Sequence, residues 1–232
     1  MRRGVKLNPQ RWWCVGAALL AFLGLGVSRA HAELTLYQTY GFYCITDNDP
    51  IDAGIGEAQL FVDVLNGADE VQFNFRNVGP NPCTITDVYF DDGTLIGLIG
   101  LIDSDDSYDG QVGHPGVDFT IDADPPDLPG GELIDPPFQV DLGFSADSDP
   151  PPPSWGVEPP DEWLGVVFLL DGGNGDVYDV LDELDNGILR IGIHVQAFGG
   201  GSNSESFVNV PEPASMLLLS LGGLALRRKR RS

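Results

Sequence analysis

Positive charge is nearly missing from the central part of this chain. Residues 33–210 contain no lysine and only two arginines, Arg76 and Arg190, against 34 of the 35 acidic residues. These counts leave a net charge of −32 for the segment, whereas the basic chain ends bring the whole chain to −23. Because such a surface repels nucleic acid and anionic lipid head groups, we expect no nucleic-acid partner.

Catalytic signatures are also missing. The central segment has only two histidines, His114 and His194, and no G-x-S-x-G or H-E-x-x-H motif. We therefore predict that the protein is not an enzyme. Carboxylates are numerous enough to supply a glycosidase pair, so a secreted hydrolase stays as an alternative without a positive motif.

The N-terminus has the three parts of a secretory signal peptide. Basic residues occupy positions 2, 3, 6 and 11, an apolar region follows over 12–27, and Ala30-His31-Ala32 is a small-x-small cleavage site. We predict that residues 1–32 form a signal helix, handled by the Sec translocon and removed by signal peptidase after Ala32.

Cysteine is rare as well, with three residues in the chain. Cys14 falls in the signal peptide, which leaves Cys44 and Cys83 in the exported part. Since disulfides form in the compartments that exported proteins enter, we expect a Cys44–Cys83 disulfide.

The C-terminus ends in three consecutive features. Pro211-Glu212-Pro213 precedes an apolar run over residues 214–226, and five cations follow: Arg227, Arg228, Lys229, Arg230 and Arg231. Thirteen residues of helix cover about 20 Å, whereas the hydrocarbon layer is about 30 Å thick. We therefore predict a transient inner-membrane anchor, with the basic cluster held in the cytoplasm.

This tail resembles the PEP-CTERM sorting signal of Gram-negative bacteria, which has the same three parts in the same order. The resemblance implies recognition and removal of the tail by an exosortase, and delivery to the cell surface or to an exopolysaccharide matrix. It covers residues 208–232 and implies nothing about the exported domain at 33–207.

Alternating apolar and polar residues dominate the exported domain and predict an all-β fold. Asn66-Gly67 predicts one hairpin, and Asp91-Asp92-Gly93 predicts a second. One helix is expected after Asp176, which is a good N-cap, with Gly187 as its stop. The expected strands are 34–45, 57–65, 70–77, 84–90, 94–102, 138–144, 163–170 and 188–198. We predict an antiparallel β-sandwich of jelly-roll type, with a β-barrel as the alternative.

The densest acidic loop is a candidate calcium site. Its carboxylates are Asp103, Asp105, Asp106 and Asp109, and oxygen ligands of this kind suit Ca²⁺. Tyr108 stands where an EF-hand needs glycine, so the loop is no EF-hand. A solvated acidic turn is the alternative interpretation.

Two roles remain open for the exported domain. The preferred one is a structural or binding protein of the cell surface or the extracellular matrix, without catalytic activity. The alternative is a carbohydrate-binding module for extracellular polysaccharide, with Trp155 in a proline-rich loop as the stacking residue and calcium as a candidate cofactor.

Overall fold

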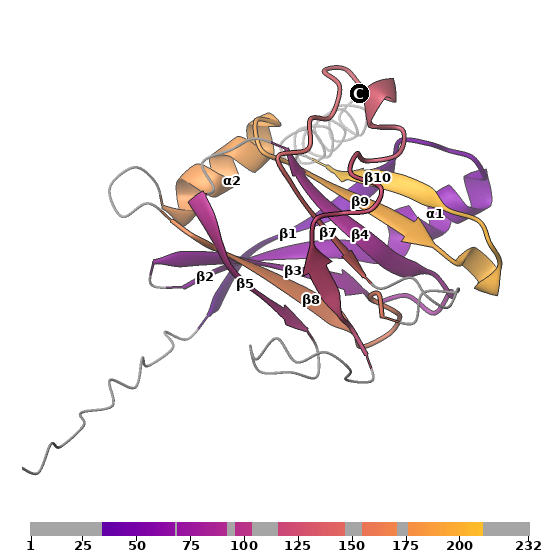
Figure 1. Ribbon diagram of the computed structural model, residues 1–232, viewed down its shortest axis with the longest axis horizontal. Coiled ribbons are helices and arrows are strands. Elements are labelled where there is room, and N and C mark those ends of the chain that lie inside the picture. Colours follow the sequence, from indigo (N-terminus) through magenta and orange to yellow (C-terminus); the bar gives the residue numbers. More distant parts are fainter. Residues whose placement is uncertain are drawn as a thin grey trace, which may run out of the picture. The chain divides into compact units, whose positions relative to one another are not determined.

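The computed structural model describes residues 34–67, 69–91, 96–103, 116–146, 155–170 and 176–210. The predicted signal helix and sorting helix both lie outside these residues. Ten strands and two α-helices are described (Figure 1). The strands are β1 (Thr35–Cys44), β2 (Leu60–Asn66), β3 (Glu70–Asn77), β4 (Thr84–Asp91), β5 (Ile96–Asp103), β6 (Phe119–Ile121), β7 (Leu142–Ala146), β8 (Trp163–Leu169), β9 (Arg190–Gln196) and β10 (Glu205–Asn209). The helices are α1 (Pro50–Gln59) and α2 (Val177–Asn186), with short 3-10 turns at Gly131–Leu133 and Phe198–Gly200.

All ten strands belong to one sheet in the order β5-β8-β3-β2-β1-β10-β9-β4-β7-β6. Every pairing is antiparallel. This confirms the predicted all-β, antiparallel class, whereas the jelly-roll topology stays a prediction. Within the described ranges, no helix has the length and apolar character needed to cross a membrane.

The two predicted hairpins have different outcomes. The hairpin at Asn66-Gly67 is confirmed, because β2 and β3 pair from Leu60↔Asn77 to Asn66↔Val71. The hairpin at Asp91-Asp92-Gly93 is wrong, because β4 pairs with β7 and β9 while β5 pairs with β8. The two edges of β4 are occupied by β7 and β9, which come much later in the chain, so no edge of β4 is left for β5.

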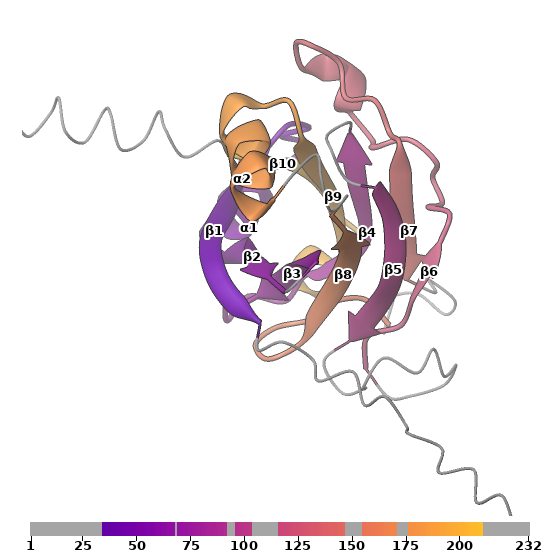
Figure 2. The same ribbon diagram turned by 90° about the vertical axis from the view of Figure 1, so that its left-hand side faces the viewer.

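The sheet curves so that its two halves share one core (Figure 2). Phe90 of β4 lies at the centre of this core. Its ring makes edge contacts with Phe73 and Phe75 of β3 and with Phe168 of β8, at centroid distances of 5.3, 6.1 and 5.0 Å. Such perpendicular aromatic pairs are favourable beyond the area they bury. The strands on both sides of β1 are therefore held together by aromatic packing.

Helix α1 was missed by the sequence pattern, which predicted a strand from residue 57. The helix begins after Asp49, whose side chain accepts a hydrogen bond from the Ile51 N–H, and Pro50 is its first residue. Its glycines and the alternation that leads into β2 hid the helical signal. The predicted strand is therefore wrong at residues 57–59 and correct from Leu60 onward.

Helix α2 confirms the prediction at both ends. Asp176 and Asp179 form a reciprocal capping box, and Gly187 takes a left-handed conformation at the C-terminal end. Val177, Val180 and Leu184 are buried in the core. This apolar face anchors the helix to the core.

A segment formed by residues 122–140 covers part of the outer face of the sheet. Leu128 and Phe138 pack there against Tyr89 of β4 and Val208 of β10. The Tyr89 hydroxyl donates to the Pro125 carbonyl at 2.9 Å. The predicted strand over 138–144 begins only at Leu142, because Phe138 packs on this outer face while Phe144 lies in the core.

Candidate functional site

Most of the site residues predicted from the sequence lie outside the described chain. These are Ala30 and Ala32, Pro211 to Pro213, the basic cluster 227–231, and Asp105, Asp106 and Asp109. Asp103 ends β5, where its backbone is the register partner of Leu164. Among the described residues, no three His, Cys, Asp or Glu side chains gather as metal ligands.

The two exported cysteines are free thiols in the structure, which does not contain the predicted disulfide. The Cys44 thiol lies 3.5 Å from a carboxylate oxygen of Glu205, and burial raises its pKa. Cys83 is buried next to Gln59 and Asn77, whose side-chain amides point at its sulfur. Desolvation raises the pKa of Cys83 to about 11.

Trp155 is less available to a ligand than its proline-rich loop suggested. Its side chain is half-buried and packs against the main core. Its carbonyl accepts a hydrogen bond from the Asp118 N–H at 2.8 Å. The expectation of an exposed stacking ring at this position is therefore not met.

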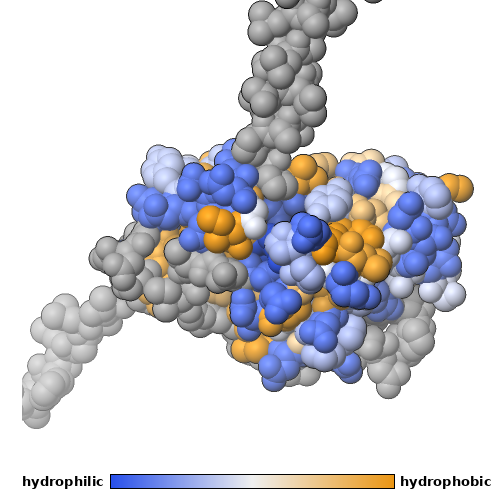
Figure 3. Space-filling view, turned by 90° about the horizontal axis from the view of Figure 1, so that it is seen from above, coloured by the Kyte–Doolittle hydropathy of each residue, from blue (hydrophilic) through white to orange (hydrophobic). Residues whose placement is uncertain are grey.

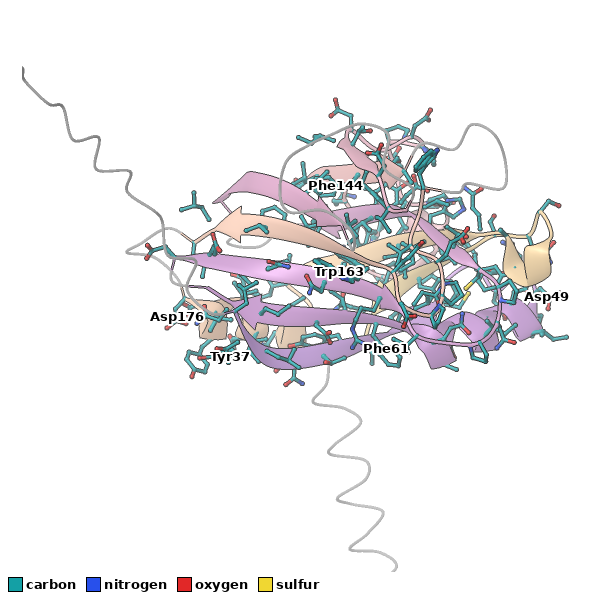
Figure 4. All side chains as sticks on the ribbon, turned by 90° about the horizontal axis from the view of Figure 1, so that it is seen from below. Tyr37, Asp49, Phe61, Phe144, Trp163 and Asp176 are labelled. Atoms are coloured by element: carbon teal, nitrogen blue, oxygen red, sulfur yellow. The ribbon has the colours of Figure 1, made fainter. Side chains whose placement is uncertain are left out.

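A more exposed aromatic side chain, Tyr178 of α2, contacts Tyr37 of β1, and Figure 4 shows Tyr37 near Asp176, the residue that caps α2. Tyr178 is 63% exposed, and its ring stands edge-on to that of Tyr37 at 5.5 Å and 76°. The neighbouring Tyr37 hydroxyl is the largest cause that raises the pKa of Tyr178. Nothing local in the sequence paired Tyr178 with Tyr37, which lies far away along the chain.

A row of polar side chains crosses the outer face of β7, β4, β9 and β10. Asp87 is the register partner of both Ser145 and His194, and His194 is in turn the partner of Ser206. Asp87 accepts hydrogen bonds from the Ser145 hydroxyl and from Thr86, and its other contact is His194 Nδ1 at 3.0 Å. Nothing in the sequence identified Asp87 as the partner of His194, because the two residues lie 107 positions apart along the chain.

The described chain holds both of its cations in ion pairs. Arg76 Nε and Nη2 donate to the two carboxylate oxygens of Asp63 at 2.6 and 2.9 Å. Arg190 pairs with Asp91 and also donates to the carbonyls of Pro136 and Pro137. No arginine is therefore left over for an anionic ligand on the described surface, one face of which is shown in Figure 3.

The carboxylate of Glu205 ties β10 to the start of α1. It is 1% exposed and accepts hydrogen bonds from the backbone N–H groups of Asn48 and Asp49 at 3.0 and 2.7 Å. Thr46 Oγ1 donates to the same carboxylate at 2.5 Å. Because a buried carboxylate needs such partners, Glu205 fixes the loop that leads into α1.

The other end of β10 continues directly toward the tail. Asn209 is 2% exposed, and its side-chain oxygen accepts a hydrogen bond from the Ile191 N–H at 2.8 Å. The next residue, Val210, donates its N–H to the Gly41 carbonyl at 2.9 Å. Backbone pairing thus extends to the residue immediately before Pro211.

Comparison with protein families identifies this tail. The family model of the PEP-CTERM protein-sorting motif matches residues 209–231. No curated protein and no solved structure matches the chain. The chain is therefore an exported protein with a C-terminal sorting signal. More particularly, its tail is a PEP-CTERM sorting signal, which implies an exosortase substrate that is sorted at the membrane to the cell envelope.

Proposed function

We propose that the mature domain is a structural or binding protein of the cell surface or the exopolysaccharide matrix, without catalytic activity. In this proposal the Sec translocon exports the chain, signal peptidase removes residues 1–32, and an exosortase removes the tail. The observation that carries the proposal is the match of the sorting motif to residues 209–231, which begins at the final residue of the last strand.

The polar row supports a non-catalytic role. Nucleophilic triads place a histidine in hydrogen-bond contact with an accessible serine. Ser206 is fully buried, and its hydroxyl has no hydrogen-bond partner among the described residues, which include His194. Ser145 bonds to Asp87 and accepts from the Asp124 N–H at 2.8 Å, which attaches the covering segment to the sheet. These contacts favour a structural role for the row.

Replacing the motif tests the sorting part of the proposal. With Pro211→Ala, Glu212→Ala and Pro213→Ala together, we expect an unprocessed, membrane-retained protein. Intact-mass measurement of the wild-type and variant proteins reads this out, because removal of the tail shortens only the wild type. Loss of the tail from the triple variant as well would contradict the proposal.

A second candidate function is carbohydrate binding, which the exposed ring of Tyr178 beside the half-buried Tyr37 favours. Aromatic rings can offer an apolar face to sugar C–H groups, and the acidic surface disfavours anionic polymers. A glycan array probed with the purified 33–210 domain tests this function. Binding that disappears in Tyr178→Ala and persists in Trp155→Phe would support the site, and the absence of any binding would reject it.

A further inference from the structure

The last strand and the sorting motif overlap in the chain. The family match begins at residue 209, which is the final residue of β10. This strand is internal to the sheet, between β1 and β9, and all of its residues are buried. The sheet therefore incorporates the first residue of the sorting signal, and no linker separates the two.

The length of chain between the fold and the membrane segment is correspondingly small. Only Pro211, Glu212 and Pro213 separate Val210 from the apolar run. A fully extended chain spans at most about 3.6 Å per residue, so these four steps reach about 14 Å. While the tail is anchored, the domain surface around Val210 must lie within that distance of the membrane segment.

The pairing pattern identifies this surface, which we call the junction face: Gly41, Asp185, Ile188 and Val210. Val210 is bonded to Gly41, while the adjacent Tyr40 donates its hydroxyl to Asp185 of α2 at 3.0 Å. Ile188 precedes β9, the strand whose Ile191 is bonded to Asn209, and is 53% exposed. The junction face thus presents one exposed apolar side chain near the point where the chain leaves the sheet.

We propose that the junction face is the docking surface of the folded domain for the membrane-embedded exosortase. The inference rests on the proposed function, since it assumes that the enzyme processes this tail. An enzyme that binds the motif must accommodate a folded domain less than about 14 Å away. Anionic head groups are repelled by the acidic domain, so the enzyme, rather than bare lipid, is the partner that this surface meets.

The opposite end of the domain provides a matched control. Glu205, at the start of β10, is bonded to the residues that lead into α1. Five strand residues span about 17 Å, so α1 begins beyond the reach of the short connection. Figure 4 shows Asp49, which caps α1, at the opposite end from Tyr37 and Asp176. Ile51 of α1 is 72% exposed and supplies the control position.

Site-specific photo-crosslinking in the native host tests the proposal. A photoreactive phenylalanine analogue replaces Ile188 in one variant of the full chain and Ile51 in the other, and crosslinked exosortase is identified by mass spectrometry. We expect a several-fold higher yield of the exosortase adduct from position 188. Equal yields from the two positions, or adducts to lipid alone at position 188, would overturn the docking surface.

A spacer insertion distinguishes a failure of the docking surface from a failure of the proposed function. Ten Gly/Ser residues inserted between Val210 and Pro211 lengthen the connection while both the fold and the motif are retained. We expect the tail still to be removed, and the adduct at position 188 to fall to the yield at position 51. An unchanged excess at position 188 would overturn docking by proximity. Tail removal from the triple-alanine motif variant would instead overturn the proposed function itself.

Discussion

Arg190 of β9 and Asp91 of β4 are register partners across two neighbouring strands, and their side chains form an ion pair. The pair is nearly buried, since 13% of the arginine and 5% of the aspartate side chain remain exposed. Arg190 also donates to the carbonyls of Pro136 and Pro137, and its guanidinium lies 5.3 Å from the centre of the Phe138 ring. One arginine thus fastens the covering segment to the sheet.

We expect Arg190→Ala to destabilise the domain by about 3 kcal/mol, because it leaves the buried Asp91 carboxylate without its cation. The matched control is Arg76→Ala, since Arg76 is the more exposed of the two arginines at 34%. Its loss should cost about 1 kcal/mol or less. Urea unfolding of both variants measures the difference. Equal losses of unfolding free energy in the two variants would contradict the expectation that the more buried ion pair contributes more to stability.

Replacement of two glycines of α1 by alanine should have opposite effects on the stability of the domain. A Cβ at Gly56 would lie 2.2 Å from Cζ of the Phe207 ring, whereas a Cβ at Gly54 would meet nothing within 4 Å. Gly56→Ala forces this core ring to move and should cost about 1–3 kcal/mol. Gly54→Ala should stabilise the helix by up to about 1 kcal/mol. Thermal unfolding checks the signs, and a stable Gly56→Ala variant would contradict the close packing.

The sequence predicted correctly those elements that depend on residues close together in the chain. Asp176 as N-cap and Gly187 as stop predicted both ends of α2, and Asn66-Gly67 predicted the β2–β3 hairpin. Helix α1 was missed because its glycines lower helix propensity. Its stability comes in part from packing on Phe207, far away along the chain.

Pairings between distant strands could not be predicted from the sequence. Alternation shows that β4 is a strand but does not identify its neighbours, so the hairpin with β5 was wrong. For the same reason nothing connected His194 with Asp87, or Tyr37 with Tyr178. The sorting signal was predictable because it depends on consecutive residues, whereas its direct junction with β10 required the sheet order.

Calcium binding remains a proposal that a simple titration can test. The acidic loop with Asp103, Asp105, Asp106 and Asp109 has ligands that suit Ca²⁺, and a bound ion would stabilise the folded state by mass action. We expect the midpoint of thermal unfolding to rise in millimolar Ca²⁺ and to return to its calcium-free value when a chelator is added. The control combines Asp105→Asn, Asp106→Asn and Asp109→Asn, which should abolish the rise. A midpoint that does not move would reject calcium as a cofactor.

The thiol of Cys83 predicts a loss of stability at alkaline pH. Its pKa rises from 9.0 to about 11 on folding, because burial disfavours the thiolate. A raised pKa in the folded state gives stability that is complete below pH 9 and is lost as the pH rises toward 11. At 1.36 kcal/mol per pKa unit, this thiol contributes about 3 kcal/mol of that loss.

Urea unfolding between pH 8 and 11 measures this effect against Cys83→Ala, which should show a shallower decline. Burial also raises the pKa of Tyr89, so part of the decline should persist in the variant. The same experiment decides between free thiols and the disulfide expected for an exported protein. A Cys44–Cys83 bond would leave no titratable thiol in the wild type, and its decline would then be no steeper than that of the variant.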